Sequence, residues 1–239
     1  MFMTGQSGHS NGELRHDFLE QARGMTREQL AEAYADASLG AVVDPVTGAL
    51  TRYYFETQFP IEVGRAHRDK GELSLLLADC DNFKRVNDMY QSHDVGGWVL
   101  ARIADIFQGE THRSTDMVCK YGGDEFAIVL PATPVANAVE MAESFRKMVQ
   151  YHTFERRPVD VDGLPLDFKE LPSGIITLSI GVSGYDASRG DVKASKLFAE
   201  ADEAMYQAKE AGRNCVRLYV PDRGIREPQR MVCRTDYSI

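Results

Sequence analysis

Two short acidic segments have the residue types and spacing of a divalent-cation site. In the first, Asp79 and Asp81 stand at the end of the apolar run 73–79. Residues two apart in an extended chain point to the same side, so these carboxylates would share one face of a strand end. The second segment is Gly-Gly-Asp-Glu at 122–125, where two glycines permit a tight turn and close approach of a ligand. Carboxylates are the hard oxygen ligands that Mg2+ prefers.

Bringing the two segments together would create a need for cations. If Asp79 faces Asp124 and Glu125 from a neighbouring strand, three negative charges converge and repel one another. A two-metal nucleotidyl-transfer site is the natural solution to that repulsion. A simpler interpretation of the first segment stays open, in which its aspartates only terminate a strand.

A basic pair near the C-terminal end provides candidate phosphate ligands. Lys209 and Arg213 fall on one stripe of a predicted helix, together with residues 202 and 206. An ammonium and a planar guanidinium could hold phosphate oxygens there. The alternative is a solvated basic pair on a last helical turn, where cations also favour the helix dipole.

The elements that must position these residues alternate between strands and helices. Periodicity and turn residues predict helices over 52–70, 82–90, 95–107, 135–151 and 195–211, and strands over 73–79, 116–121, 125–130, 175–182 and 215–220. Pro60 is expected to kink or split the first of these helices. The segment 154–173 is rich in Pro, Gly and Asp and is expected to hold a small hairpin. This order predicts an α+β fold with helices on one or both faces of a sheet.

The segments outside this core are expected to be simpler. Residues 1–12 are polar and predicted to be disordered, and 221–239 form a polar tail without periodicity. Between them, 13–40 predict a helical extension before a domain that covers 41–220. The narrow apolar face of that extension fits either packing within the chain or a dimerisation stalk.

Composition excludes several functional classes. The formal net charge of −9 argues against general nucleic-acid binding, so a bound triphosphate would need local cations and metal ions. The 4 cysteines form no C-x-x-C pair and are expected to be reduced thiols. We find no run long enough for a membrane span and no signal peptide, which predicts a cytoplasmic protein.

Taken in order, these motifs resemble those of the GGDEF family of diguanylate cyclases. Tyr-Gly-Gly-Asp-Glu-Phe stands at 121–126, and 44–52, 79–88, 179–182 and 201–214 are similar to the family's other motifs. The resemblance covers about 41–220. It implies a fold like the palm of polymerases and adenylyl cyclases, with a central, largely antiparallel sheet surrounded by helices.

The resemblance also implies an activity: condensation of two GTP into cyclic di-GMP with release of pyrophosphate. Asp79, Asp124 and Glu125 would be the catalytic carboxylates and, with the Cys80 carbonyl, would bind two Mg2+ or Mn2+ ions. Each domain would hold one nucleotide, so catalysis would need a homodimer. The nucleotide-binding positions of the family fall on Asn82, Phe83, Lys84, Asn87, Gly97, Lys209 and Arg213. Asn87 would lie at the guanine edge, and the three basic residues, with the backbone amides at 82 and 83, would hold the triphosphate.

A second site of the family matches Arg113-x-x-Asp116, with five residues between Asp116 and Gly122. The resemblance implies that Arg113 and Asp116 bind the product, cyclic di-GMP, and inhibit the enzyme. The alternative is a surface arginine and an aspartate that precedes a strand.

The chain departs from the family where guanine is recognised. One residue is inserted before His93, and Gly97 stands where the family has an aspartate that accepts from guanine. Three outcomes stay open: a cyclase that uses only GTP, a relaxed cyclase that also takes ATP and makes mixed 3',3'-cGAMP, or a non-catalytic cyclic di-GMP receptor. Asp94 could replace the missing acceptor if the inserted loop folds back. Lys120, where the family often has Arg, is a smaller departure.

Overall fold

The computed structural model describes residues 41–90, 93–154, 171 and 173–221, and the side chains of 93 and 94 are outside that description. The expectations for 1–40, for the hairpin within 155–170 and for the tail fall outside the described residues. The elements are β1 (Leu50–Thr51), α3 (Arg52–Asp69), β2 (Leu73–Asp81), α4 (Phe83–Tyr90), α5 (His93–Glu110), β3 (Met117–Lys120), β4 (Glu125–Pro131), α6 (Val135–Tyr151), β5 (Thr177–Tyr185), η1 (Ala187–Arg189), α7 (Ala194–Glu210) and β6 (Cys215–Leu218).

One six-stranded sheet organises the described part of the chain, in the order β1-β3-β4-β2-β5-β6. The pairs β3–β4, β4–β2 and β2–β5 are antiparallel, whereas β1–β3 and β5–β6 are parallel. The predicted α+β fold with a largely antiparallel sheet is therefore confirmed. The two-residue strand β1 was not predicted, because so short a segment carries no periodicity.

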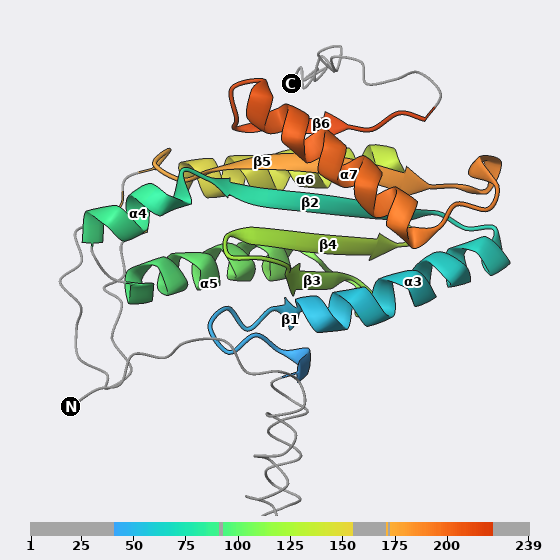
Figure 1. Ribbon diagram of the computed structural model, residues 1–239, viewed down its shortest axis with the longest axis horizontal. Helices are drawn as coiled ribbons and strands as arrows, with labels where there is room; N and C mark the ends of the chain where they lie inside the picture. Colours follow the sequence, from blue (N-terminus) through green and yellow to red (C-terminus); the bar gives the residue numbers. More distant parts are fainter. Residues whose placement is uncertain (1–40, 91–92, 155–170, 172, 222–239) are drawn as a thin grey trace, which may run out of the picture. The chain divides into compact units, whose positions relative to one another are not determined.

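Helices cover both faces of this sheet (Figure 1). The side chains of β2 alternate between the faces, as a strand requires: Leu76 and Ala78 join one buried cluster, Leu75 and Leu77 the other. Helices α4, α5 and α6 pack on the first face, and α3 and α7 on the second. Since both faces are covered, the central strands are almost wholly apolar, which explains why β2 shows no polar alternation.

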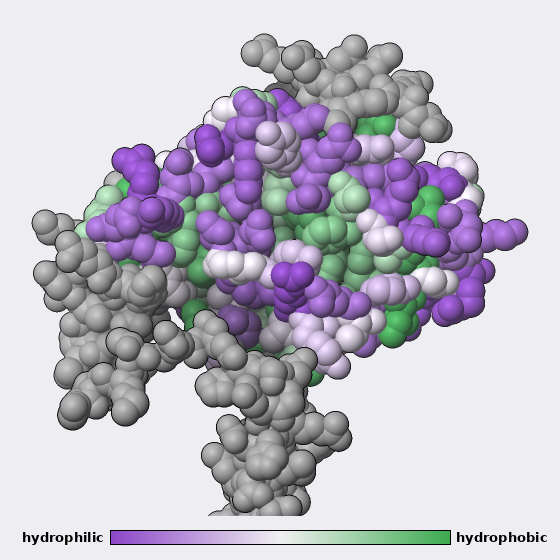
Figure 2. Space-filling model, in the orientation of Figure 1, coloured by the Kyte–Doolittle hydropathy of each residue, from purple (hydrophilic) through white to green (hydrophobic). Residues whose placement is uncertain are grey.

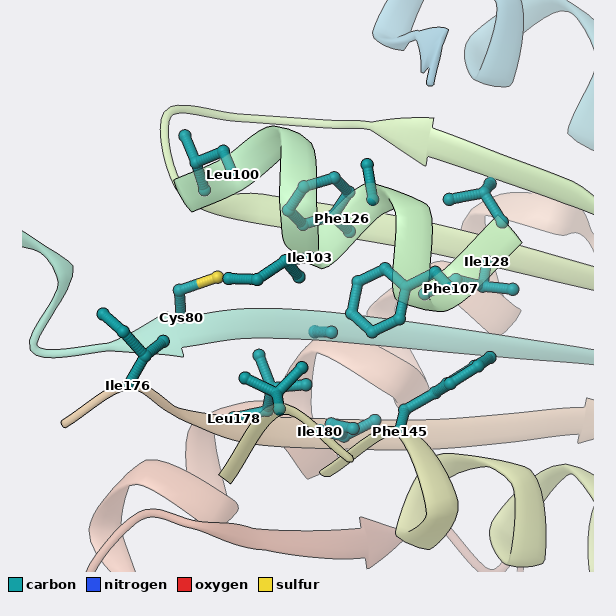
Figure 3. Packing of buried hydrophobic residues seen from close by; sticks show 14 of the residues in the cluster. Cys80, Leu100, Ile103, Phe107, Phe126, Ile128, Phe145, Ile176, Leu178 and Ile180 are labelled. Atoms are coloured by element: carbon teal, nitrogen blue, oxygen red, sulfur yellow. The ribbon is translucent and has the colours of Figure 1, made fainter. Parts of the chain in front are cut away.

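Aromatic rings fill the centre of the first face. Phe107 of α5 lies edge-on to Phe126 of β4, with ring centroids 5.2 Å apart, and to Phe145 of α6, at 4.8 Å. Figure 3 shows these rings between the helices and the sheet. Edge-to-face pairs of this kind add to the free energy gained by burying the rings. They fix α5 and α6 against the strands that end at the acidic segments.

Of the two effects expected of Pro60, the splitting of the helix is wrong, because helix α3 runs continuously through the proline. The residues of α3 that are buried follow helical spacing on both sides of the proline: Phe55, Phe59, Val63 and Ala66. Their packing against the sheet stabilises the helix despite the one backbone hydrogen bond that a proline removes.

The outer surface of the α3 and α7 face is mainly hydrophilic around a central strip of hydrophobic residues (Figure 2). Partly buried side chains such as Tyr54, Tyr121 and Phe198 pack against the cluster beneath. None of the helices in the described part of the chain combines the length and apolar character that a bilayer crossing needs.

Candidate active site

Strand pairing brings the two acidic segments together. In the β2–β4 ladder Asp79 lies directly opposite Glu125, and the backbone N–H of Cys80 donates to the Asp124 carbonyl at 3.1 Å. The β3–β4 hairpin closes as predicted through Gly122 and Gly123. The predicted meeting of Asp79 with the tip of this hairpin is therefore confirmed at the level of the backbone.

The carboxylates at this edge are poorly compensated. Burial raises the pKa of Asp79, an effect that a hydrogen bond from Lys209 opposes and the negative charge of Asp124 reinforces. Burial also raises the pKa of Glu125, and the charge of Asp79 adds to that rise. A nearby cation would therefore stabilise the ionised form of both carboxylates. A metal site needs this kind of electrostatic environment.

An ammonium group lies against one of these carboxylates. Lys209 Nζ is 2.7 Å from Asp79 Oδ2, and the side chains are 29% and 14% exposed. Among the described residues, no three His, Cys, Asp or Glu side chains are arranged to enclose a metal ion. Asp79 Oδ2 accepts from Lys209 instead. The donor set of Asp79, Asp124 and Glu125 nevertheless fits Mg2+ by its hard oxygens and its excess negative charge.

Asp81 has surroundings quite unlike those of Asp79, although the two lie on one face of β2. It is 1% exposed and accepts from the hydroxyls of Thr177 and Ser179, both at 2.7 Å, and from the backbone N–H of Asn214 at 3.0 Å. The first acidic segment thus contains one carboxylate that faces the hairpin and one that is already bonded within the fold.

The hairpin tip is held by a residue that sequence reasoning did not place in the site. Lys120 Nζ donates to the carbonyl of Gly123 at 2.7 Å and also to that of Gly122. Burial lowers the pKa of Lys120, against the opposing influence of nearby Asp124 and Glu125. The sequence does indicate this residue, because Lys120 directly precedes the hairpin at a position where the family often has arginine, another cation.

A pocket of about 410 Å3 adjoins the acidic edge. It is lined by Phe83, Lys84, Asn87, Gly96, Gly97, Leu100, Gly123 and Asp124. The Oδ1 atom of Asn87 is buried and has no hydrogen-bond partner in the structure. A buried acceptor without a partner is costly, so this atom marks where a ligand could donate a hydrogen bond.

The side-chain amide of Asn87 packs directly against the backbone of Gly96. A Cβ atom at Gly96 would lie 2.1 Å from Asn87 Oδ1, so a side chain there would displace the amide. At Gly97 a Cβ atom would lie 3.0 Å from Val46 Cγ1. The pocket therefore offers the Asn87 amide but no side chain at 97. The side chain of Asp94, considered as a substitute, lies outside the described residues.

The predicted phosphate ligands lie around the start of α4 and the end of α7. Asn82 has φ of 58° and its carbonyl accepts from the Arg85 N–H, which starts the helix directly after β2. Phe83 is buried, and Lys84 is exposed at the pocket. Arg213 is exposed, with φ of 67°, just beyond α7.

Helix α7 reaches the acidic edge because it packs closely on β5. A Cβ atom at Gly181 would lie 2.0 Å from the Ala201 carbonyl oxygen and 2.2 Å from the Met205 nitrogen. Only glycine lets the two backbones approach this closely. The contact brings Lys209, one turn further along α7, within reach of Asp79.

The two residues of the expected inhibitory site lie together in the turn between α5 and β3. The N–H of Arg113 donates to Asp116 Oδ2 at 3.3 Å, and its Nη1 donates to the Ala132 carbonyl at 3.1 Å and the Thr133 hydroxyl at 3.2 Å. Asp116 Oδ1 is buried without a partner, and burial raises the pKa of this carboxyl. The guanidinium is thus engaged by the loop after β4, while Asp116 keeps an unused acceptor.

Comparison with known proteins identifies the family. The sequence model described as "Diguanylate cyclase, GGDEF domain" matches residues 41–215. This chain belongs to the GGDEF domain family. The matched region contains every residue discussed above as part of the acidic edge and its pocket, so the geometry belongs to a GGDEF domain.

Several curated proteins are similar to this GGDEF domain. The response regulator PleD of Caulobacter vibrioides is 37% identical over 179 residues, which are 74% of this chain and 36% of PleD. Diguanylate cyclase DgcM of Escherichia coli is 35% identical over 203 residues, 84% of this chain and 42% of that protein. The chain therefore spans less than half the length of each of these relatives.

Solved GGDEF structures share the fold. The active GGEEF domain of a diguanylate cyclase from Vibrio cholerae aligns with a TM-score of 0.54 and 31% identity, covering 69% of this chain and 93% of that one. Diguanylate cyclase SiaD of Pseudomonas aeruginosa, solved with its activator SiaC, aligns with a TM-score of 0.63 and 28% identity, covering 87% and 75%.

Proposed function

We propose that this chain is a diguanylate cyclase that condenses two GTP into cyclic di-GMP and releases pyrophosphate. The observation that supports it most is the pocket beside the acidic edge, which Asn87 and Asp124 both line and where Asn87 Oδ1 is buried without a hydrogen-bond partner among the described residues. A purine can donate to that acceptor while its phosphates extend toward the carboxylates and Lys209. Relatives named as diguanylate cyclases support the same activity.

The acidic residues would hold divalent cations. We assign Asp79, Asp124, Glu125 and the Cys80 carbonyl to two Mg2+ or Mn2+ ions, whose chemistry is to stabilise charge that develops on the phosphate oxygens. The raised pKa values of Asp79 and Glu125 support this assignment, because a bound cation would relieve the repulsion between them.

The protein's own residues would bind and orient the nucleotide. Asn87 accepts from the base, Lys84, Lys209 and Arg213 hold phosphate oxygens, and the backbone at Asn82 and Phe83 follows the triphosphate at the start of α4. Each domain presents one such pocket, so the 3′-hydroxyl that attacks the α-phosphate must come from a nucleotide on a second domain. Catalysis therefore needs a homodimer, in which positioning supplies much of the rate.

Feedback by the product is a separate part of the proposal. The backbone N–H of Arg113 already donates to Asp116 Oδ2, and Asp116 Oδ1 has no partner among the described residues. Cyclic di-GMP would accept from the guanidinium and donate to the carboxylate. Calorimetric binding of cyclic di-GMP that disappears in Arg113→Ala would support this, and a flat titration of the wild-type protein would contradict it.

A second candidate activity is the use of ATP alongside GTP. It is favoured by Gly97, which supplies no carboxylate to the pocket. The pocket therefore lacks, at this position, an acceptor for the N–H donors that distinguish guanine from adenine. One experiment separates the candidates: purified protein and Mg2+ are incubated with GTP, with ATP and with both, and products are resolved by mass spectrometry. Cyclic di-GMP alone supports the first candidate, and a mixed GMP–AMP cyclic dinucleotide supports the second. The absence of any dinucleotide would contradict both and leave a cyclic di-GMP receptor.

A further inference from the structure

Asp81 is a carboxylate that the proposed reaction does not use, yet it lies next to the reacting groups. Its side chain is 1% exposed and is bonded to strand β5 and to the turn that follows α7. Oδ1 accepts from Ser179, and Oδ2 accepts from Thr177 and from the backbone N–H of Asn214. A carboxylate has about four acceptor positions, so three donors leave little capacity for a metal ion.

The turn that Asp81 holds has an unusual backbone. Arg213 and Asn214 follow one another in the left-handed region, with φ of 67° and 46°, and neither is glycine. L-residues with side chains rarely adopt this conformation twice in succession without support. The support consists of three bonds: Arg213 N–H to the Ala208 carbonyl at 3.0 Å, Asn214 N–H to Asp81, and Arg146 Nη1 to Asn214 Oδ1 at 2.8 Å.

We propose that Asp81 is a positioning residue, which fixes the Arg213–Asn214 turn and thereby aims the Arg213 guanidinium at the triphosphate. The inference rests on the proposed function, because it takes Arg213 as a phosphate ligand. Asp81 acts through the backbone of the neighbouring residue and touches no substrate. Its bonds join the end of β2 to the Arg213–Asn214 turn that follows α7, so one buried carboxylate fixes where that turn lies.

The test compares four proteins in cyclase assays at saturating Mg2+: wild type, Asp81→Ala, Arg213→Ala and the double variant. We expect Asp81→Ala to raise the KM for GTP about tenfold with a smaller change in kcat, because ground-state binding of the phosphates is lost. In the Arg213→Ala background the same substitution should add less than about twofold, because the two residues act on one contact. Independent, multiplying effects would overturn the proposal.

A conservative variant separates positioning from metal binding. The amide of Asp81→Asn can accept from the Asn214 N–H and donate to the Ser179 hydroxyl, so it can keep the network without the charge. We expect its KM for GTP and its half-saturating Mg2+ concentration to stay within about threefold of wild type. A hundredfold loss of kcat or a large shift in the Mg2+ requirement would mean that Asp81 binds metal, which would overturn the proposal.

Two further variants keep the test decisive if Asp81→Ala does not fold. Asn214→Ala loses the bond from Arg146 and strains the left-handed position. The KM for GTP should therefore rise, as it does in Asp81→Ala, and an unchanged KM would overturn the proposal.

Ser183→Ala is the matched control, since it removes a buried 2.7 Å bond from β5 to the Leu197 carbonyl at the other end of the sheet. It should leave the KM unchanged, and an equal rise there would overturn the proposal by showing a general loss of packing. A wild-type protein that makes no cyclic dinucleotide would instead refute the proposed function itself.

Discussion

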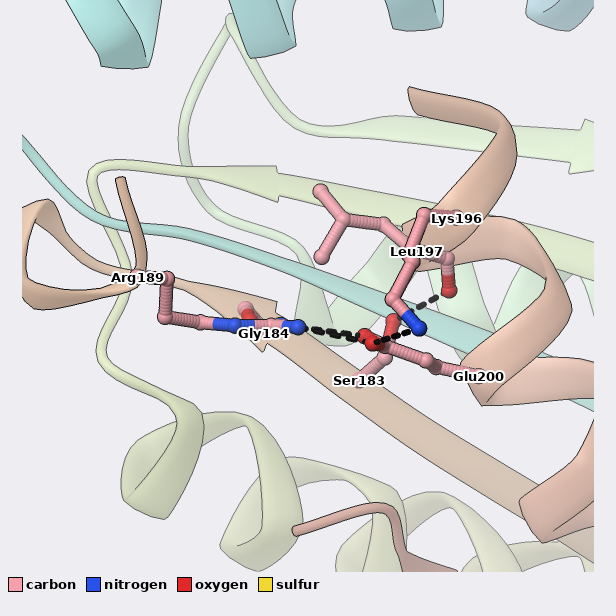
Figure 4. A network of polar contacts seen from close by, with 6 residues as sticks. All are labelled: Ser183, Gly184, Arg189, Lys196, Leu197 and Glu200. Carbon is pink, nitrogen blue, oxygen red and sulfur yellow. Dashed lines mark hydrogen bonds and ion pairs between the residues drawn. The ribbon is translucent and has the colours of Figure 1, made fainter. Parts of the chain in front are cut away.

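The two ends of β5 hold charged groups in opposite conditions. At the end that pairs with Asp79, carboxylates have raised pKa values and Asn87 keeps an acceptor without a partner. At the other end, Glu200 is 3% exposed and accepts from Arg189 through both oxygens, at 2.7 and 2.9 Å, as Figure 4 shows. Arg189 also donates to the Gly184 carbonyl. Glu200 is therefore paired within the fold through both oxygens, whereas the carboxylates at the acidic edge keep negative charge that the protein compensates only in part.

The difference distinguishes a ligand site from a structural network. Both ends border pockets, of about 410 Å3 at the acidic edge and about 560 Å3 beside Glu200. Volume alone would favour the larger one. The bonding state favours the smaller one, because groups that lack partners inside the protein gain most from a ligand, whereas a bidentate ion pair already has its partners.

The largest expected contrast is between two glutamates. Glu125→Gln should fold normally and lower kcat by at least about a hundredfold, the order of loss when one electrostatic stabiliser is removed from an active site. Glu200→Gln should instead lower stability and leave catalysis intact. The substitution leaves Arg189 buried without its charged partner, so the free energy of unfolding should fall by about 3 kcal/mol, and the folded fraction should retain its kcat. Pyrophosphate release and denaturant unfolding measure the two effects. Activity that survives in Glu125→Gln would remove that residue from the metal site.

The next contrast lies within the pocket, between a glycine and a carboxylate at position 97. Gly97→Asp should raise the preference for GTP over ATP by at least about tenfold, because a carboxylate accepts from guanine and leaves adenine unpaired. Val46 lies close to the new Cβ but is 57% exposed and has room to move. Competition between the nucleotides in one reaction gives the ratio directly.

The control for that change is Gly97→Asn, which has nearly the same shape without the charge. It should shift the preference less than the aspartate does. If Gly97→Asp folds and the preference does not change, recognition of the base does not depend on this position.

Much of this comparison could be predicted from the sequence, because its motifs are contiguous. The turn at Gly122, the strand ending in Asp79 and the helix bearing Lys209 each lie within one segment, and local periodicity places them. The bonding state could not be predicted in this way. Asp81 bonds to residues 96, 98 and 133 positions away, and Lys209 to one 130 positions away. Asp79 and Asp81 are two residues apart and chemically identical. The family resemblance names Asp79 alone, and the folded chain gives the physical reason, because only Asp81 is bonded to β5 and to the turn after α7.

A smaller effect is expected at the two lysines of α7. Lys209 Nζ bonds to Asp79, so it competes with any cation for that oxygen. Lys209→Met should therefore tighten Mn2+ binding to the nucleotide-free protein about fivefold, corresponding to the ~1 kcal/mol of a partly exposed ion pair. Electron paramagnetic resonance of free Mn2+ measures this without turnover. Lys196→Met is the matched control, since Lys196 lies 3.6 Å from Glu200, at the end of the sheet away from the acidic edge. This substitution should leave Mn2+ binding unchanged. Equal affinities in wild type and Lys209→Met would show that the ammonium and the metal do not compete.

The smallest expected effect tests whether an unpartnered acceptor away from the acidic edge also carries a cost. Burial raises the pKa of Asp116 above the ordinary value of an aspartate, although Arg113 and His112 partly oppose the rise. The folded protein then holds this proton more tightly than the unfolded chain, so the ionised carboxylate lowers stability above the folded pKa, and the cost vanishes below the unfolded pKa. Asp116→Asn should accordingly raise the free energy of unfolding at pH 7 by roughly 0.5 kcal/mol or less after solvent screening, with no gain at pH 3. Asp105→Asn, which removes a surface ion pair with Arg102, should show no such gain at pH 7. A gain for Asp116→Asn that persists unchanged at pH 3 would trace the cost to shape rather than to charge.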